Sequence, residues 1–262
     1  MLRFLPQLLP LMVFVGMCTE SLHAQQWGDL TGQFIYDGTP PTASPVTVTK
    51  DIEVCGKHML VNESLVVGPD GGLANVVVYL YLGLGDLKPE VHSSYAESEK
   101  SEVALDNDKC RFAPHIALLR TSQTLVIGNK DAVGHNTKID TIANAPINPI
   151  IPAGGQLSQQ FPAEERLPFP VSCSIHPWMQ AYLVVKEHPY IAASDASGKF
   201  VIKNLPAGTW TFQAWQEKAG YVSDVTLNGS PTEWSRGRFE ITIEPGVNDL
   251  GEIKVAARAF QN

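Results

Sequence analysis

The chain has 262 residues, a net charge of −8 and no basic stripe, which argues against nucleic acid as its main partner. Charged residues make up 18% of it, whereas soluble domains typically have roughly 25%. Its 21 glycines and 19 prolines suit a chain of many short strands and turns. The length allows one large domain or two ordinary ones.

Residues 1–24 have the pattern of a secretory signal peptide. Arg3 gives a short positive start, Leu8–Val15 is apolar, and a small-residue cleavage site closes the segment. This apolar run is too short to span a bilayer comfortably, so we expect no stable membrane insertion after cleavage. Lipid attachment at Cys18 is an alternative, but the bulky Met17 before it argues against this. We therefore expect an exported protein, periplasmic or secreted, whose mature chain is still acidic.

Short alternating or β-branched runs, bounded by Gly, Pro, Asn and Asp, predict an all-β protein. The predicted strands are Leu30–Tyr36, Val46–Thr49, Asn75–Leu82, Ile116–Leu119, Thr124–Gly128, Tyr182–Val185, Lys199–Lys203, Thr209–Trp215 and Arg238–Ile243. Strong helical periodicity is nearly absent. The polar stretch 88–109 is typical of a solvated loop or a short helix.

The last part of the chain contains two neighbouring predicted strands joined by a turn at residues 204–208. Phe200 precedes the turn and Trp210 and Phe212 follow it, which predicts a hairpin with its aromatic residues on one face. The arrangement D-x-x-G-x-F-x-I-x-N-L-P-x-G-x-W-x-F-x-A-W resembles the carboxypeptidase regulatory-like (transthyretin-like) module. The resemblance implies a small β-sandwich over residues 190–262 that acts as a scaffold or docking domain.

A thiol, an imidazole and a thioether lie within seven residues, at Cys173, His176 and Met179. A short loop between two strands can turn all three side chains towards one point. Soft thiolate and thioether ligands beside imidazole favour copper over zinc, calcium or magnesium. Zinc stays open as an alternative, although methionine is a poor zinc ligand. A second imidazole is available at His135, which follows a hydrophobic strand and a turn starting at Asn129.

These motifs together resemble the cupredoxin family, and most closely its amicyanin and plastocyanin-like branch. The matching features are Phe112-Ala-Pro114, the N-x-D-x-x-x-H-N turn at residues 129–136, and the C-x2-H-P-aromatic-M loop at residues 173–179. The resemblance implies a cupredoxin-like Greek-key sandwich with a copper-binding core at residues 111–187. We expect an N-terminal β segment, residues 25–110, to pack on this core or complete it.

The resemblance also implies a role for each site residue. His135 is expected to be the buried first ligand, Cys173 the thiolate ligand, and Met179 the weak axial ligand of one type 1 (blue) copper ion. His176 is expected to be the second imidazole, near the surface with its edge towards solvent. Asn136 is a candidate for orienting the ligands by hydrogen bonds around the sulfur.

Gly134, Pro177 and Trp178 are expected to surround the exposed ligand edge with apolar surface for a redox partner. In this family such partners include c-type cytochromes and dehydrogenases. We do not expect this protein to be an enzyme, because the sequence has no G-x-S-x-G elbow, phosphate-binding glycine loop or HExxH helix. The resemblance implies single-electron transfer as the function. The alternatives are a copper carrier or storage protein, and a metal-free β-sandwich that binds a partner.

Three cysteines remain after removal of the predicted signal peptide, so one thiol is left over if two pair. Cys55 and Cys110 lie outside the ligand loop, and export favours a disulfide between them. The alternative is a second metal site, because Cys55-x2-His58 and Cys110-x4-His115 together supply two thiols and two imidazoles.

Overall fold

The computed structural model describes Met1 and residues 26–261, and this part of the chain is almost entirely β, as predicted. The predicted signal peptide lies outside the described residues, apart from Met1. No helix in the described part is long and apolar enough to cross a membrane. The helical turns are α1 (Ile52–Cys55), η1 (Ser93–Tyr95), η2 (Ser235–Gly237) and η3 (Ala257–Phe260).

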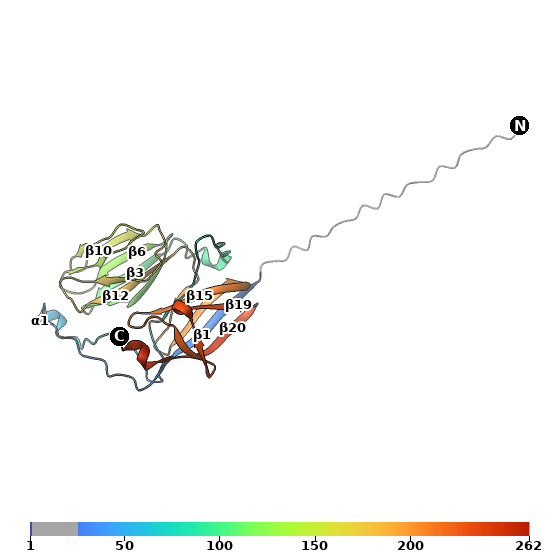
Figure 1. The fold of residues 1–262 in the computed structure, drawn as a ribbon. Coiled ribbons are helices and arrows are strands. Elements are labelled where there is room, and N and C mark those ends of the chain that lie inside the picture. Colours follow the sequence, from blue (N-terminus) through green and yellow to red (C-terminus); the bar gives the residue numbers. More distant parts are fainter. Residues whose placement is uncertain (2–25, 262) are drawn as a thin grey trace.

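The strands form two β-sandwiches that lie side by side (Figure 1). The first sandwich packs a sheet of order β10-β6-β3-β4 against one of order β5-β12-β11-β8, with the short pair β7-β9 beside them. Its strands are β3 (Glu102–Asp108), β4 (Arg111–Ala113), β5 (Ile116–Arg120), β6 (Thr124–Asn129), β7 (His135–Asn136), β8 (Lys138–Ile139), β9 (Ile150–Ile151), β10 (Gln156–Gln160), β11 (Phe169–Ser172) and β12 (Gln180–Lys186). Leu105, Phe112 and Leu125 are among the fully buried side chains of its core.

The second sandwich packs a sheet of order β14-β1-β20-β17-β18 against one of order β13-β2-β15-β16, in which β19 also pairs with β15. Its strands are β1 (Trp27–Asp37), β2 (Val77–Leu80), β13 (Ile191–Ala193), β14 (Lys199–Pro206), β15 (Gly208–Gln216), β16 (Gly220–Tyr221), β17 (Asp224–Leu227), β18 (Ser230–Glu233), β19 (Arg238–Ile243) and β20 (Gly246–Ala256). Phe34, Phe200 and Phe212 lie in its core.

The N-terminal β segment is placed differently from the expectation for residues 25–110. β1 lies between β14 and β20, and β2 lies between β13 and β15, so both strands belong to the second sandwich. The inward side chains of β1, such as Leu30 and Phe34, pack into the second core rather than the first. Of this segment only β3 joins the first sandwich, where it pairs with β6 and β4.

The prediction that residues 199–215 form a hairpin is wrong: both strands exist, but they do not pair with each other. β14 pairs with β1 in one sheet, whereas β15 pairs with β2 and β19 in the facing sheet. Asn204, with φ 50°, and Gly208, with φ 133°, carry the chain across the sandwich. Alternating burial shows that each strand has one core face, but it does not say which strand lies beside it.

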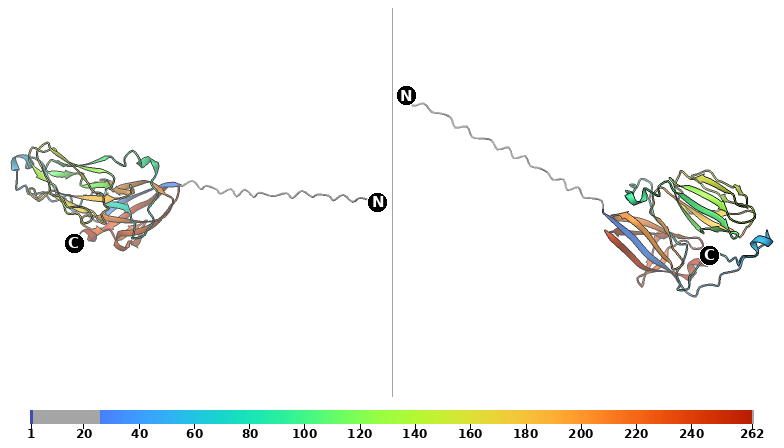
Figure 2. Two further views of the ribbon diagram at one scale, coloured as in Figure 1. Left: turned by 90° about the horizontal axis from the view of Figure 1, so that it is seen from above. Right: turned by 180° about the vertical axis from the view of Figure 1, so that it is seen from behind.

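The segment between β1 and β2 leaves the second sandwich and reaches the end of the first (Figures 1 and 2). The predicted strand Val46–Thr49 is absent there. Backbone bonds from Val46 to the Leu60 carbonyl and from Asn62 to the Ser44 carbonyl instead close a compact loop. We call residues 46–60 the covering loop; it carries α1.

His188 lies buried on the connection between the two sandwiches. Its Nε2 lies 3.0 Å from the Leu80 carbonyl oxygen, and its Nδ1 accepts a hydrogen bond from the Tyr190 backbone. Burial is the main reason that the pKa of His188 is lowered from 6.5 to about 4. The folded protein therefore holds this imidazole neutral.

We predict that His188 makes the protein less stable as the pH falls from 6.5 to about 4, because the unfolded chain takes up a proton that the folded chain excludes. Between pH 7 and pH 5 the loss is about 2 kcal/mol in free energy of unfolding. Urea unfolding at the two pH values measures it. His188→Asn should be less stable overall and lose most of this pH dependence; an unchanged dependence would contradict the assignment.

Candidate metal centre

The loop between β11 and β12 places two of the predicted ligands, Cys173 and His176, against each other. Cys173 directly follows β11 and Met179 directly precedes β12. The Cys173 amide donates to the Met179 carbonyl at 3.3 Å, and the Met179 amide donates to the His176 carbonyl at 2.9 Å. This folded loop brings Cys173 Sγ to 3.7 Å from His176 Nδ1.

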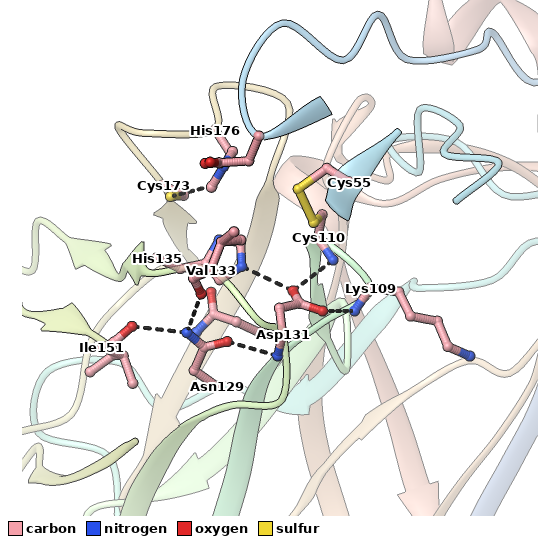
Figure 3. Close-up of polar contacts among 12 residues, drawn as sticks. Cys55, Lys109, Cys110, Asn129, Asp131, Val133, His135, Ile151, Cys173 and His176 are labelled. Carbon is pink, nitrogen blue, oxygen red and sulfur yellow. Dashed lines mark hydrogen bonds and ion pairs between the residues drawn. A yellow bond between two sulfur atoms is a disulfide. The ribbon is translucent and has the colours of Figure 1, made fainter. Parts of the chain in front are cut away.

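His135 reaches the same point from β7, which pairs with β9. Its ring centroid lies 4.6 Å from that of His176. Single ligand atoms of His135, Cys173 and His176 all lie within 4.8 Å of one another, and all three residues are buried. Figure 3 shows the three side chains converging. Three of the four predicted ligands are thus brought together.

Met179 lies in the same buried cluster as Cys173, with 1% of its surface exposed. Its backbone helps to close the ligand loop, as described above. Cys173 is the one cysteine of the described residues outside a disulfide.

The protonation state of His135 follows from its two ring nitrogens. Nε2 lies 2.9 Å from an oxygen of Asp131, whereas Nδ1 is buried and has no hydrogen-bond partner among the described residues. Burial, and next the neighbouring His176, lowers the pKa of His135 below its usual range. A neutral ring that donates from Nε2 keeps a lone pair on Nδ1, which is the state that binds a metal ion. The residues present therefore fit a bound metal.

The Asp131 carboxylate connects the site to the turn between β3 and β4. One of its oxygens accepts the Lys109 amide at 2.7 Å, and the other accepts the Cys110 amide at 2.8 Å as well as His135. Asn129 holds Asp131 in place through its own side-chain oxygen, which accepts the Asp131 amide at 3.0 Å. Figure 3 shows this network.

Asn136 lies where it was expected, beside the sulfur. Its side-chain oxygen accepts the Ser174 amide at 2.7 Å and the Ile175 amide at 3.2 Å, and it lies 3.4 Å from Cys173 Sγ. A single amide group thus holds both β7 and the ligand loop.

The edge of the His176 ring does not face solvent as was expected. The residue is fully buried, and its Nε2 lies 2.8 Å from a carboxylate oxygen of Asp51 in the covering loop. Among the expected partner-facing residues, Pro177 is exposed, whereas Gly134 and Trp178 are half-buried. Trp178 donates its indole N–H to the Cys110 carbonyl at 3.1 Å. Asp51 was missed in the sequence analysis, because its contact with His176 spans 125 residues.

Cys55 and Cys110 form a disulfide, with their Cα atoms 5.4 Å apart. Both thiols are therefore unavailable to the alternative second metal site. His58 and His115 nevertheless line one cavity of about 690 Å³ beside Trp178. His115 lies 2.6 Å from Glu217 of the second sandwich through its Nε2.

Comparisons with known proteins find similar structures for part of the chain. No family model and no curated protein matches it. A Cu(I) form of an amicyanin variant has 17% identity over 43% of this chain and 99% of its own, with a TM-score of 0.30. A purple cupredoxin from Nitrosopumilus maritimus has 21% identity over 33% and 100%, with a TM-score of 0.27. The copper-containing nitrite reductase from Thermus scotoductus has 19% identity over 42% and 25%, with a TM-score of 0.30.

We predict that Asn136→Ala destabilises the metal-free protein by about 2 kcal/mol, because the Ser174 and Ile175 amides lose their acceptor. Urea unfolding measures the change. Asn148→Ala is the matched control, because the side-chain oxygen of Asn148 accepts a hydrogen bond from the amide nitrogen of Asn136, at 2.5 Å, and Asn148 is itself exposed. This control should change stability by less than about 0.5 kcal/mol. Equal losses in the two variants would refute the role given to the Asn136 oxygen.

Proposed function

We propose that His135, Cys173, His176 and Met179 hold one type 1 copper ion, and that the protein carries single electrons. The observation that supports this most is the buried group of one thiol and two imidazoles, in which His135 Nδ1 has no hydrogen-bond partner within the described part of the chain. A His2Cys set with a weak thioether ligand is the donor set of blue copper sites. Bound copper would supply a one-electron Cu(I)/Cu(II) couple.

The surrounding residues suit this task because they hold the ligands independently of the metal. Asp131 orients His135, and Asn136 holds the ligand loop that carries Cys173. A donor set held in this way needs little rearrangement when the charge of the ion changes. Met179, directly before β12, would be the weak axial ligand that tunes the potential.

The wider proposal keeps the setting expected from the sequence. We propose an exported electron carrier, not an enzyme, that exchanges electrons with redox proteins such as a c-type cytochrome or a dehydrogenase. The second sandwich would be a scaffold or docking unit, in line with the resemblance of residues 191–220 to the carboxypeptidase regulatory-like module.

Visible absorption of the purified protein, before and after addition of Cu(II), tests the proposal. We expect an intense blue charge-transfer band that bleaches on reduction and returns on oxidation. Cys173→Ser should remove the band because the thiolate is lost, whereas Ser174→Ala, next to it in the chain, should keep it. A Cys173→Ser protein that stays blue would show that the ligand assignment is wrong.

The same sample separates electron transfer from copper transport. Repeated reduction and oxidation without loss of copper would support electron transfer as the function. Ready release of the ion to an acceptor protein would support a copper carrier instead, and failure to bind copper with Cys173 intact would support a metal-free binding module.

A further inference from the structure

The covering loop gives this site a feature that the sequence resemblance did not imply. Backbone bonds join its two ends, and the Cys55–Cys110 disulfide attaches it to the turn between β3 and β4. The same turn is held by the Asp131 carboxylate, which also contacts His135. The loop is therefore anchored on the metal centre itself rather than on a distant surface.

Asp51 is the residue of this loop that contacts the centre. It precedes α1 in the left-handed conformation, with φ 46° and ψ 45°, and one of its carboxylate oxygens lies 2.8 Å from His176 Nε2. The Asp51 side chain is 40% exposed, whereas His176 is 0% exposed. A non-glycine residue in this conformation is uncommon and points to a constraint that the surroundings maintain.

Both imidazoles thus have a carboxylate on the nitrogen that faces away from Cys173. Asp131 holds His135 from inside the sandwich, and Asp51 holds His176 from the loop. An acceptor on one ring nitrogen fixes the proton there and leaves the other nitrogen as the metal ligand. The two contacts differ in their access to solvent, because the Asp131 side chain is 6% exposed whereas the Asp51 side chain is 40% exposed.

We propose that Asp51 is a positioning residue for His176 and that the covering loop is a gate over the metal centre. The gate closes the route to Cys173 and to the outer edge of His176, and it opens when the Asp51–His176 contact breaks. This inference rests on the proposed function only for the loaded site, because Cys173 is buried in the metal-free protein as well. An electron partner would then contact the closed loop and Pro177 rather than a bare imidazole.

The first test measures how fast iodoacetamide alkylates Cys173 in the metal-free full-length protein, by mass spectrometry of the peptide that contains it. Asp51→Gly removes the carboxylate and still tolerates a positive φ. We expect it to raise the alkylation rate about tenfold, since a hydrogen bond to a charged group is lost from the closed state. Cys55→Ala with Cys110→Ala should raise the rate as well, because the loop loses its anchor.

Glu53→Gln is the matched control, because Glu53 lies exposed in α1 and its substitution removes the same charge two residues away from Asp51. Its alkylation rate should equal that of the unaltered protein. Equal rates in the unaltered protein, Asp51→Gly and the double cysteine variant would overturn the gate. This readout needs no copper, so it stands even if the protein never turns blue.

The second test measures the reduction potential of the copper-loaded protein. Asp51→Asn keeps the shape and the left-handed backbone but removes the negative charge beside His176. The lost charge favours Cu(I) over Cu(II), so the potential should rise more in Asp51→Asn than in Glu53→Gln. Equal potentials in these two variants would overturn the positioning role of Asp51.

Discussion

The buried Asp131 carboxylate is the group on which the site depends. It accepts two backbone amides of the β3–β4 turn and lies within hydrogen-bond distance of His135. A buried carboxylate is stable only when donors surround it, so these partners and the carboxylate require one another. The turn it holds contains Cys110, which carries the disulfide to the covering loop. One group therefore fixes the tautomer of His135 and the anchor of the loop above it.

The remaining parts of the centre are held by chain segments that are distant in sequence. Asn136 of β7 binds amides of the loop that follows β11, and Asp51 reaches His176 from the segment between β1 and β2. The three donors consequently keep their arrangement through contacts that do not involve a metal ion. Such pre-arranged ligands suit a redox ion whose preferred geometry would otherwise change with its charge.

The candidate donors could be selected from the sequence because their order and spacing carry the information. Cys173, His176 and Met179 lie in one short loop, and His135 follows a recognisable turn. All the strands named from the sequence except Val46–Thr49 are present, because alternating burial is a local property. Several strands were missed, β3 (Glu102–Asp108) among them. Four of the seven residues of β3 are Glu, Asp or Asn, which are typical of a solvated segment.

The other errors concern which segments lie beside one another. The pairing of β1 with β20 is parallel and joins opposite ends of the chain, and no local pattern specifies it. The burial of His176 depends in the same way on Asp51, whose position follows from the path of a loop without regular strands. Long-range contacts of this kind are set by the packing of the whole fold, so a single sequence shows the residues but not their neighbours.

The central claim is that one copper ion binds two imidazoles and one thiolate at this centre. X-ray absorption at the copper edge of the loaded protein tests it most directly, because it reports the number and type of atoms bound to the ion. We predict that the copper ion has two nitrogen neighbours and one close sulfur neighbour, in the oxidised and the reduced protein alike. A copper ion surrounded by oxygen and nitrogen alone, without sulfur, would contradict it.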